Sequence, residues 1–159
     1  MRPKVIVLDL DKVLWDHYNV SDLTPPFRRI SERMIEDRWG EIVTLRDDVR
    51  EFLSFAKSRG IKLSTCSWNH FDKALEVLKA FELDHYFDLL MIEPHPEKQL
   101  MMERILSSLG VREEEVVFVD DRDYMLEKVR SKFPRIKTIR FHPAGDCFSF
   151  RELMKLIGD

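Results

Sequence analysis

The sequence predicts an α/β fold with a doubly wound, mainly parallel, five-stranded sheet that carries helices on both faces. Short apolar runs alternate along the chain with longer amphipathic segments of helical periodicity. Several of the apolar runs end in polar or acidic residues, which is typical of parallel strands that present a ligand site beyond their carboxyl ends. No internal repeat, low-complexity tract or linker interrupts the alternation.

The first predicted strand covers residues 4–8, a short apolar run rich in β-branched side chains. Residues 12–24 carry loop-forming side chains. A helix is expected over residues 25–39, because the segment is entered through proline and one of its sides would be apolar. The apolar residues of that side are Phe27, Ile30, Met34 and Ile35.

A clearer helix is predicted from residue 47 onward, because Asp47 or Asp48 can cap its start and Gly60 can end it. Ser149 is a plausible cap of the last helix. Strands are predicted over residues 61–65, 86–92, 115–119 and 136–141, and the helices between and after them over residues 69–83, 96–110, 123–133 and 149–157.

The 159 residues fit one domain, residues 1–159, with a core large enough to be stable without disulfides. The chain is 44% hydrophobic and 35% charged with a net charge of -3, which predicts a globular protein with no general attraction for nucleic acid or anionic membranes. No apolar run approaches the roughly 18 residues of a membrane span, and no signal peptide is apparent, so we expect a cytoplasmic protein. Cys66 and Cys147 form no paired motif, which fits a reducing compartment.

Polar residues follow three of the predicted strands. Asp9 and Asp11 follow the first, the stretch TCSWN (residues 65–69) ends the second, and Asp120 and Asp121 follow the fourth. Two like charges about 4 Å apart repel by roughly 4 kcal/mol at an effective dielectric constant of about 20, so acids placed there need a compensating partner.

We expect these side chains to face one crevice, together with Lys98 at the start of a helix, where a cation gains nothing from the helix dipole. Several carboxylates, a hydroxyl and an ammonium group are what phosphoryl transfer requires, since the acids hold a divalent cation and the donors hold the phosphate. Mg²⁺ is therefore the predicted partner of the acids.

These motifs resemble those of haloacid dehalogenase (HAD) superfamily phosphatases, and most closely those of the magnesium-dependent phosphatase family. The resemblance spans nearly the whole chain, in the family's order, through DLDKVLW, PPF, CSWN, PEKQL and FVDDRD. It implies a HAD-like, Rossmann-like fold with a minimal cap or none. The first and last motifs are specific in combination.

Carried over residue by residue, the resemblance implies that Asp9 is the nucleophile, forming an aspartyl-phosphate, and that Asp11 is the general acid and base. Mg²⁺ would be held by Asp9, the backbone carbonyl of Asp11 and Asp121, with Asp120 as an alternative or more distant ligand. Lys98 would neutralise the charge that the nucleophile shares with the phosphate.

The same resemblance assigns phosphate and substrate binding to the hydroxyl of Ser67, to the following Trp68 and Asn69, and to backbone N–H groups around Leu10. Two positions depart from the family pattern. Val13 stands where many relatives have threonine, and Met125 stands where the fourth motif often has asparagine or aspartate. We expect activity to survive, with support for the metal site either weaker or supplied by Asp123.

The spacing of the motifs predicts an open site. One helix and one short strand fill the stretch between Ser67 and Lys98, which leaves no room there for a large cap. Residues 16–41 form a small insertion of a loop and one helix that would wall one side of the site. We therefore expect a phosphorylated small molecule, a sugar phosphate or a phosphoprotein (phosphotyrosine) as substrate.

Each site residue also has a structural alternative. The acids after the first strand could cap a helix, Ser67 could cap the helix that follows it, and Lys98 could be a solvated lysine. Asp123 could be an ordinary acid in the first turn of a helix. The five histidines show no zinc-binding spacing.

Three functional alternatives remain. One is a phospho-receiver module, although a receiver has its lysine after the fifth strand and Lys98 precedes the fourth. Another is a phosphate-binding partner without turnover. The third acts on nucleic-acid ends through the basic run of residues 128–140, which a solvated helix face and an edge strand also explain. The oligomeric state and the physiological substrate are left open by the sequence.

Overall fold

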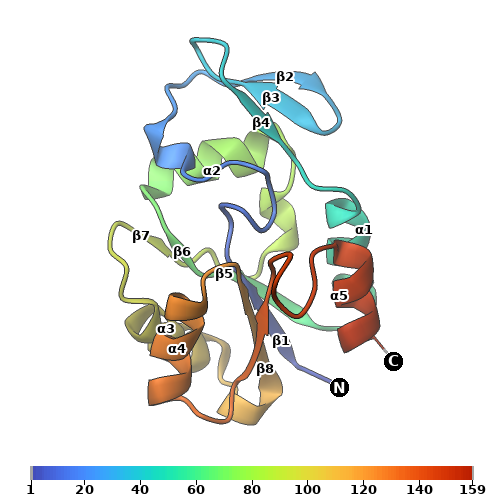
Figure 1. Cartoon of the computed structure of the whole chain (residues 1–159), viewed down its shortest axis with the longest axis vertical. Coiled ribbons are helices and arrows are strands. Elements are labelled where there is room, and N and C mark those ends of the chain that lie inside the picture. Colours follow the sequence, from blue (N-terminus) through green and yellow to red (C-terminus); the bar gives the residue numbers. More distant parts are fainter. Residues whose placement is uncertain (1, 159) are drawn as a thin grey trace.

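A four-stranded parallel sheet forms the centre of the molecule (Figure 1). The computed structural model describes residues 2–158. The strands are β1 (Val5–Leu8), β5 (Lys62–Thr65), β8 (Val116–Asp120) and β9 (Lys137–Arg140), in the order β5-β1-β8-β9. Each neighbouring pair is parallel, so the carboxyl ends of all four strands lie at one edge of the sheet. The α/β fold with a parallel sheet is thereby confirmed.

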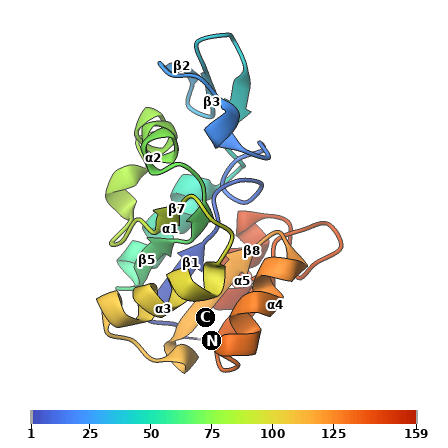
Figure 2. The same cartoon turned by 90° about the vertical axis from the view of Figure 1, so that its left-hand side faces the viewer.

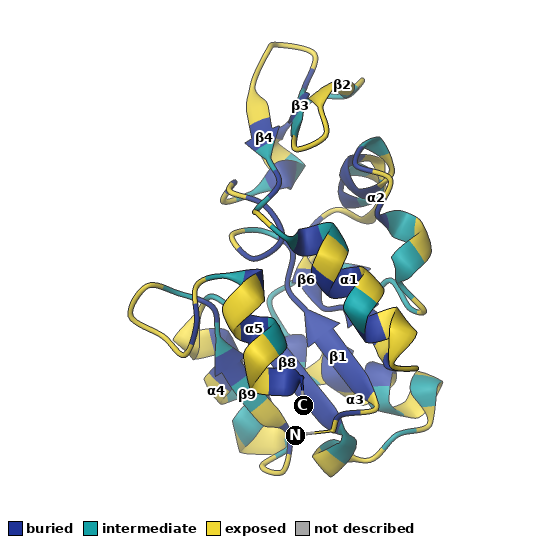
Figure 3. Ribbon diagram, turned by 90° about the vertical axis from the view of Figure 1, so that its right-hand side faces the viewer, coloured by how far each residue is buried: buried dark blue, intermediate teal, exposed yellow. Residues whose placement is uncertain are grey.

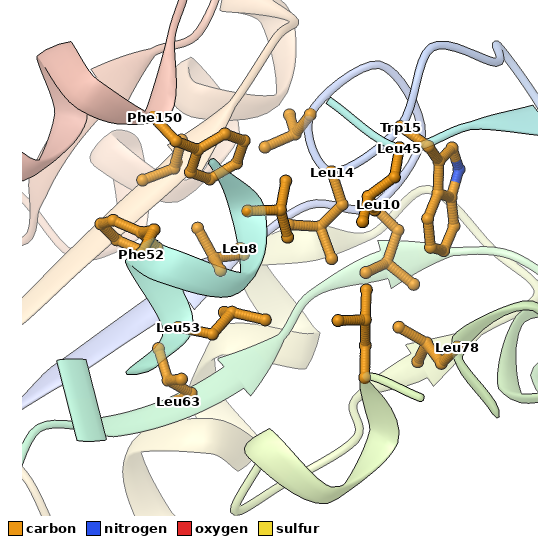
Figure 4. Close-up of a cluster of buried hydrophobic side chains, with 14 of the residues drawn as sticks. Leu8, Leu10, Leu14, Trp15, Leu45, Phe52, Leu53, Leu63, Leu78 and Phe150 are labelled. Atoms are coloured by element: carbon orange, nitrogen blue, oxygen red, sulfur yellow. The ribbon is translucent and has the colours of Figure 1, made fainter. Parts of the chain in front are cut away.

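Both faces of β1 are buried, because its alternate side chains enter two separate cores. Ile6 and Leu8 pack against α1 (Val49–Ser58), α2 (Phe71–Ala80) and α5 (Phe150–Ile157). Figure 4 shows part of this core, with Leu8 near Phe52 and Phe150. Val5 and Val7 pack against α3 (Lys98–Leu109) and α4 (Asp123–Lys132). Figure 3 shows β1 and β8 as a buried layer between the helices.

The expectation of five strands in the central sheet is wrong, because the predicted third strand, residues 86–92, does not join it. Residues 84–86 form a 3₁₀ turn, η2 (Asp84–Tyr86), and only β7 (Ile92–Glu93) pairs as a strand, with β6 (Ser67–Trp68). The carboxylate of Asp88 accepts a hydrogen bond from the Leu63 N–H at 2.8 Å, and Leu89 makes only an isolated bridge to Ser64. The side chain of Asp88 thus accepts a hydrogen bond from β5 where a continuous strand would accept it through its backbone.

The helix predicted over residues 25–39 is wrong. This segment forms β2 (Arg28–Ser31) and β3 (Met34–Glu36), which continue with β4 (Ile42–Thr44) as an antiparallel sheet. Ile35 lies opposite Val43, and both are buried. Figure 2 shows this small sheet at the far end of the molecule from α3 and α4. The strand that pairs with β3 is β4, which lies outside residues 25–39. The apolar spacing within residues 25–39 therefore could not indicate this pairing.

The ends of the helices agree in part with the predicted caps. Ser149 accepts a hydrogen bond from the N–H of Glu152 and caps α5, and Gly110 ends α3 in the left-handed conformation. Asp48 precedes α1 in the left-handed conformation and makes no capping bond with its side chain, so that predicted cap is wrong. Within residues 2–158, no helix is both long and apolar enough to span a membrane.

Candidate active site

The polar residues at the carboxyl edge of the sheet line one cavity of about 310 Å³. Asp9 and Asp11 follow β1, Asn69 follows β6, and Asp121 follows β8, while Lys98 is the first residue of α3. Because the strands are parallel and adjacent, loops that are far apart in the sequence meet here. The expected crevice is present, but Ser67 and Asp120, which were also expected to face it, are fully buried and do not line it.

Lys98 lies between two carboxylates. Its Nζ is 3.0 Å from Asp9 Oδ1 and 2.6 Å from Asp120 Oδ2, and all three side chains are buried. The other carboxyl oxygen of Asp120 accepts the N–H of Arg122 at 2.9 Å. Lys98 is therefore not a solvated lysine, and Asp120 is occupied at both oxygens.

These contacts have opposite effects on the ionisation of the buried groups. Burial raises the pKa of Asp9 to about 7 although Lys98 opposes the shift, and burial raises the pKa of Asp120 to about 6. Burial also raises the pKa of Asp121. Burial alone would lower the pKa of Lys98, but Asp120 and Asp9 outweigh it and leave that pKa above its ordinary value.

Three of the acids form a candidate cation site. One carboxyl oxygen from each of Asp9, Asp120 and Asp121 lies within 4.8 Å of the others. When ionised, three carboxylates around one ammonium group would leave two negative charges unbalanced, and a divalent cation carries the two positive charges that balance them. Carboxylate oxygens are also the ligands that Mg²⁺ prefers, so the residues present fit this ion.

The carboxylate of Asp11 is held by three donors. Oδ1 accepts hydrogen bonds from Trp15 Nε1 at 2.8 Å and from the Val20 N–H at 3.2 Å. Oδ2 accepts one from Asn69 Nδ2 at 3.0 Å. Burial raises the pKa of Asp11, and these hydrogen bonds oppose the rise. Trp15 is fully buried, and its hydrogen bond helps to orient the carboxylate of Asp11.

Ser67, Trp68 and Asn69 differ in their surroundings. Ser67 is fully buried, and its Oγ accepts a hydrogen bond from Asn69 Nδ2 at 2.8 Å. The N-cap of α2 is His70, so Ser67 does not cap that helix. Trp68 is about half exposed and lines the cavity. The N–H of Leu10 donates to Asp9 Oδ1 at 2.8 Å and so holds the carboxylate.

Tyr18, Ser21 and His70 also line the cavity. Of these, Ser21 has no clear signal in the sequence, because it lies in a loop that contains no motif. Met125 is buried and also lines the cavity. Asp123, expected to support the metal, instead lies 3.5 Å from Arg130, and its side chain is 66% exposed.

Comparison with known proteins gives a consistent picture. The model of a family described as Acid Phosphatase matches residues 1–132. Human magnesium-dependent phosphatase 1 is 32% identical over 120 residues, which cover 75% of this chain and 68% of that protein. A phosphorylated carbohydrates phosphatase from Thermotoga maritima is 28% identical over 126 residues, or 75% of this chain, which spans only 57% of that relative.

A solved structure shows the same fold. A HAD-superfamily hydrolase of subfamily IA from Geobacter sulfurreducens aligns with a TM-score of 0.68 at 19% sequence identity. The alignment covers 98% of this chain and 100% of that one. At this identity the likeness extends to the fold.

Proposed function

The chain belongs to the acid phosphatase family and is a magnesium-dependent phosphatase of the HAD superfamily, and from this premise we propose that it hydrolyses phosphomonoesters through an aspartyl-phosphate on Asp9. The observation that carries the proposal is the buried arrangement of Asp9, Lys98 and Asp120 beside the more accessible Asp121. This arrangement supports the proposal because Asp9 would serve as the nucleophile, Lys98 as a fixed cation and Asp121 as a metal ligand, all within one small region. Family membership favours this reading over a receiver module.

Asp9 would attack phosphorus through one carboxyl oxygen while the bond between phosphorus and the ester oxygen breaks. Lys98, 3.0 Å from Asp9 Oδ1, would stabilise the negative charge that moves during this transfer. Asp11 would give its proton to the departing oxygen. In the second half Asp11 would take a proton from water, which attacks phosphorus and releases Asp9.

Mg²⁺ would be held by Asp9, Asp121 and the backbone carbonyl of Asp11, where it supplies positive charge that offsets repulsion between carboxylate and phosphate. Asp121 suits this role better than Asp120. Both oxygens of Asp120 are already bound, by Lys98 and by the N–H of Arg122, whereas Asp121 lines the cavity. Asp120 would instead fix Lys98.

For the substrate we propose phosphorylated small molecules, including sugar phosphates, with the side chain of a phosphotyrosine on a protein as a second class. Tyr18 and Trp68 support the second class, because both line the cavity and have exposed fractions of 63% and 47%. Such aromatic side chains can flank the ring of an aryl phosphate. From the insertion of residues 16–41, only Tyr18, Asn19 and Ser21 line the cavity.

Phosphate release from p-nitrophenyl phosphate tests the proposal. We expect turnover that requires Mg²⁺, stops with a chelator and falls to background in Asp9→Asn. Asp47→Asn is the matched control, because this acid is exposed and pairs with Arg33 away from the cavity. In the wild type, mass spectrometry after acid quenching should detect the aspartyl-phosphate. Turnover that persists in Asp9→Asn would rule this intermediate out.

A further inference from the structure

Ser21 joins two loops of the active site. It lies in the short 3₁₀ turn η1 (Val20–Asp22), and its Oγ accepts the N–H of His70 at 2.9 Å. The same hydroxyl donates its proton to Asn69 Oδ1. Since the acceptor side of the hydroxyl is taken by a backbone N–H, its single proton is directed at the amide of Asn69.

Asn69 has one favourable orientation in this network. Its Nδ2 donates to Asp11 Oδ2 at 3.0 Å and to Ser67 Oγ at 2.8 Å. An ionised carboxylate only accepts hydrogen bonds, so a rotated amide would set its carbonyl oxygen against Asp11. Asn69 is only 3% exposed, so water cannot readily replace a missing partner.

The hydrogen bonds to Asp11 leave one place for a transferable proton. Trp15 and Val20 donate to Oδ1 and use both of its lone pairs, whereas Asn69 uses one lone pair of Oδ2. The remaining lone pair of Oδ2 is the position that a proton can occupy. The amide of Asn69 therefore fixes the oxygen through which Asp11 exchanges protons.

We propose that Ser21 is a positioning residue for the phosphatase reaction, acting through Asn69 to hold Oδ2 of Asp11 where it protonates the leaving oxygen. This inference rests on the proposed function. In the step concerned, the bond between phosphorus and the ester oxygen breaks, the bond between Asp9 and phosphorus forms, and the proton of Asp11 passes to the ester oxygen. Nothing in the sequence around Ser21 indicates this role.

A purely structural role can be separated from this one. The Nζ of Lys73 donates to the backbone carbonyl of Ser21 at 2.8 Å, which ties η1 to α2. Ser21→Ala keeps that bond and removes only the hydroxyl. A loss of activity that occurs only in variants without the hydroxyl therefore reports on the contact with Asn69.

The test is the dependence of kcat/KM on the leaving group. An alkyl phosphate such as glycerol 1-phosphate needs a proton on its leaving oxygen, whereas p-nitrophenolate leaves without one. General acid catalysis contributes about 10²- to 10⁴-fold, and partial misplacement of the acid should lose part of it. We expect Ser21→Ala to lower kcat/KM about tenfold for the alkyl ester and less than about twofold for the aryl ester.

Three further variants complete the test. Ser21→Thr keeps the hydroxyl and should restore the alkyl activity. Ser21→Cys keeps the side-chain size with a much weaker donor, and should give the same selective loss if the alanine variant does not fold. Ser58→Ala, in α1 with its hydroxyl bound to the Phe55 carbonyl, is the matched control and should retain both activities.

Equal losses for the two esters, or failure of Ser21→Thr to restore activity, would overturn the inference. A double-mutant cycle gives a second test. If Ser21 acts through Asn69, Ser21→Ala should cause no further loss of kcat/KM for the alkyl ester in an Asn69→Ala background. Losses that multiply in the double variant would overturn the inference. Absence of Mg²⁺-dependent turnover in the wild type would instead overturn the proposed function beneath it.

Discussion

Charged residues are buried at the carboxyl edge of the central sheet, whereas they are largely exposed in the small sheet of β2, β3 and β4. At the edge, Asp9, Lys98 and Asp120 are buried and satisfy one another. In the small sheet, Arg28 pairs with Glu36 at the surface, and every residue of β2 is exposed.

This difference shows where structure and function depend on the same contacts. A buried charge that loses its partner is costly, whereas a surface pair contributes little. The charged edge should therefore tolerate substitution poorly in both stability and activity, and the small sheet should tolerate it well.

The largest effect is expected from Lys98→Met. It leaves Asp9 and Asp120 buried without their cation, which should lower the free energy of unfolding by about 3–5 kcal/mol and lower kcat by about 10²-fold or more. Urea unfolding and phosphate release measure the two effects. Lys128→Met is the matched control, since Lys128 pairs with Glu97 at 3.3 Å near the surface, and it should cost about 1 kcal/mol or less.

A smaller effect is expected from apolar truncation in the two regions. Ile6→Ala in β1 should lower the free energy of unfolding by about 2–5 kcal/mol, because Ile6 is fully buried. Trp39→Ala, between β3 and β4, should change it by about 0.5 kcal/mol or less, because Trp39 is 77% exposed. Similar losses in both variants, measured by urea unfolding, would contradict the contrast.

The smallest effect concerns the opposite end of β1. Lys4 Nζ lies 2.7 Å from Glu115, and this contact together with the Arg112 N–H lowers the pKa of Glu115 from 4.5 to about 2. A carboxyl whose folded pKa is lowered stabilises the fold above its unfolded pKa and loses that contribution as the pH falls through its folded pKa. Stability should therefore decline between about pH 4.5 and pH 2.

Lys4→Met should make that decline shallower, because the pKa of Glu115 would then lie closer to its ordinary value. Thermal melting at pH 6 and pH 3 measures the slope in both proteins. Equal slopes would show that the ion pair does not couple Glu115 to folding.

Local patterns in the sequence were sufficient for the four strands of the central sheet, although they also predicted a fifth over residues 86–92. They were also sufficient for the position of the acids and the lysine of the candidate site. The apolar run of β1, followed at once by Asp9 and Asp11, predicts a strand with acids at its carboxyl end. The acids after β8 add a second such end, and parallel strands bring the two together. These features can be predicted because the apolar run that forms a buried strand and the acids that follow it lie within one short segment.

Residues 25–44 show where local patterns are insufficient. Phe27, Ile30 and Met34 are spaced as on a helix, yet Ile35 is buried by pairing opposite Val43 in β4. Asp37 also accepts the N–H groups of Trp39 and Glu41, which builds the turn between β3 and β4. A strand partner outside the segment decided its structure.

The sequence by itself therefore determined the fold class, the acids and the lysine of the candidate site, and the phosphatase family. Only the tertiary structure decided that Asp120 binds Lys98 at 2.6 Å, and that Ser21 reaches Asn69 across 48 residues of chain. Apolar periodicity records what each segment buries. Hydrogen-bond partners from separate loops are set by how those loops pack, and no local pattern encodes that packing.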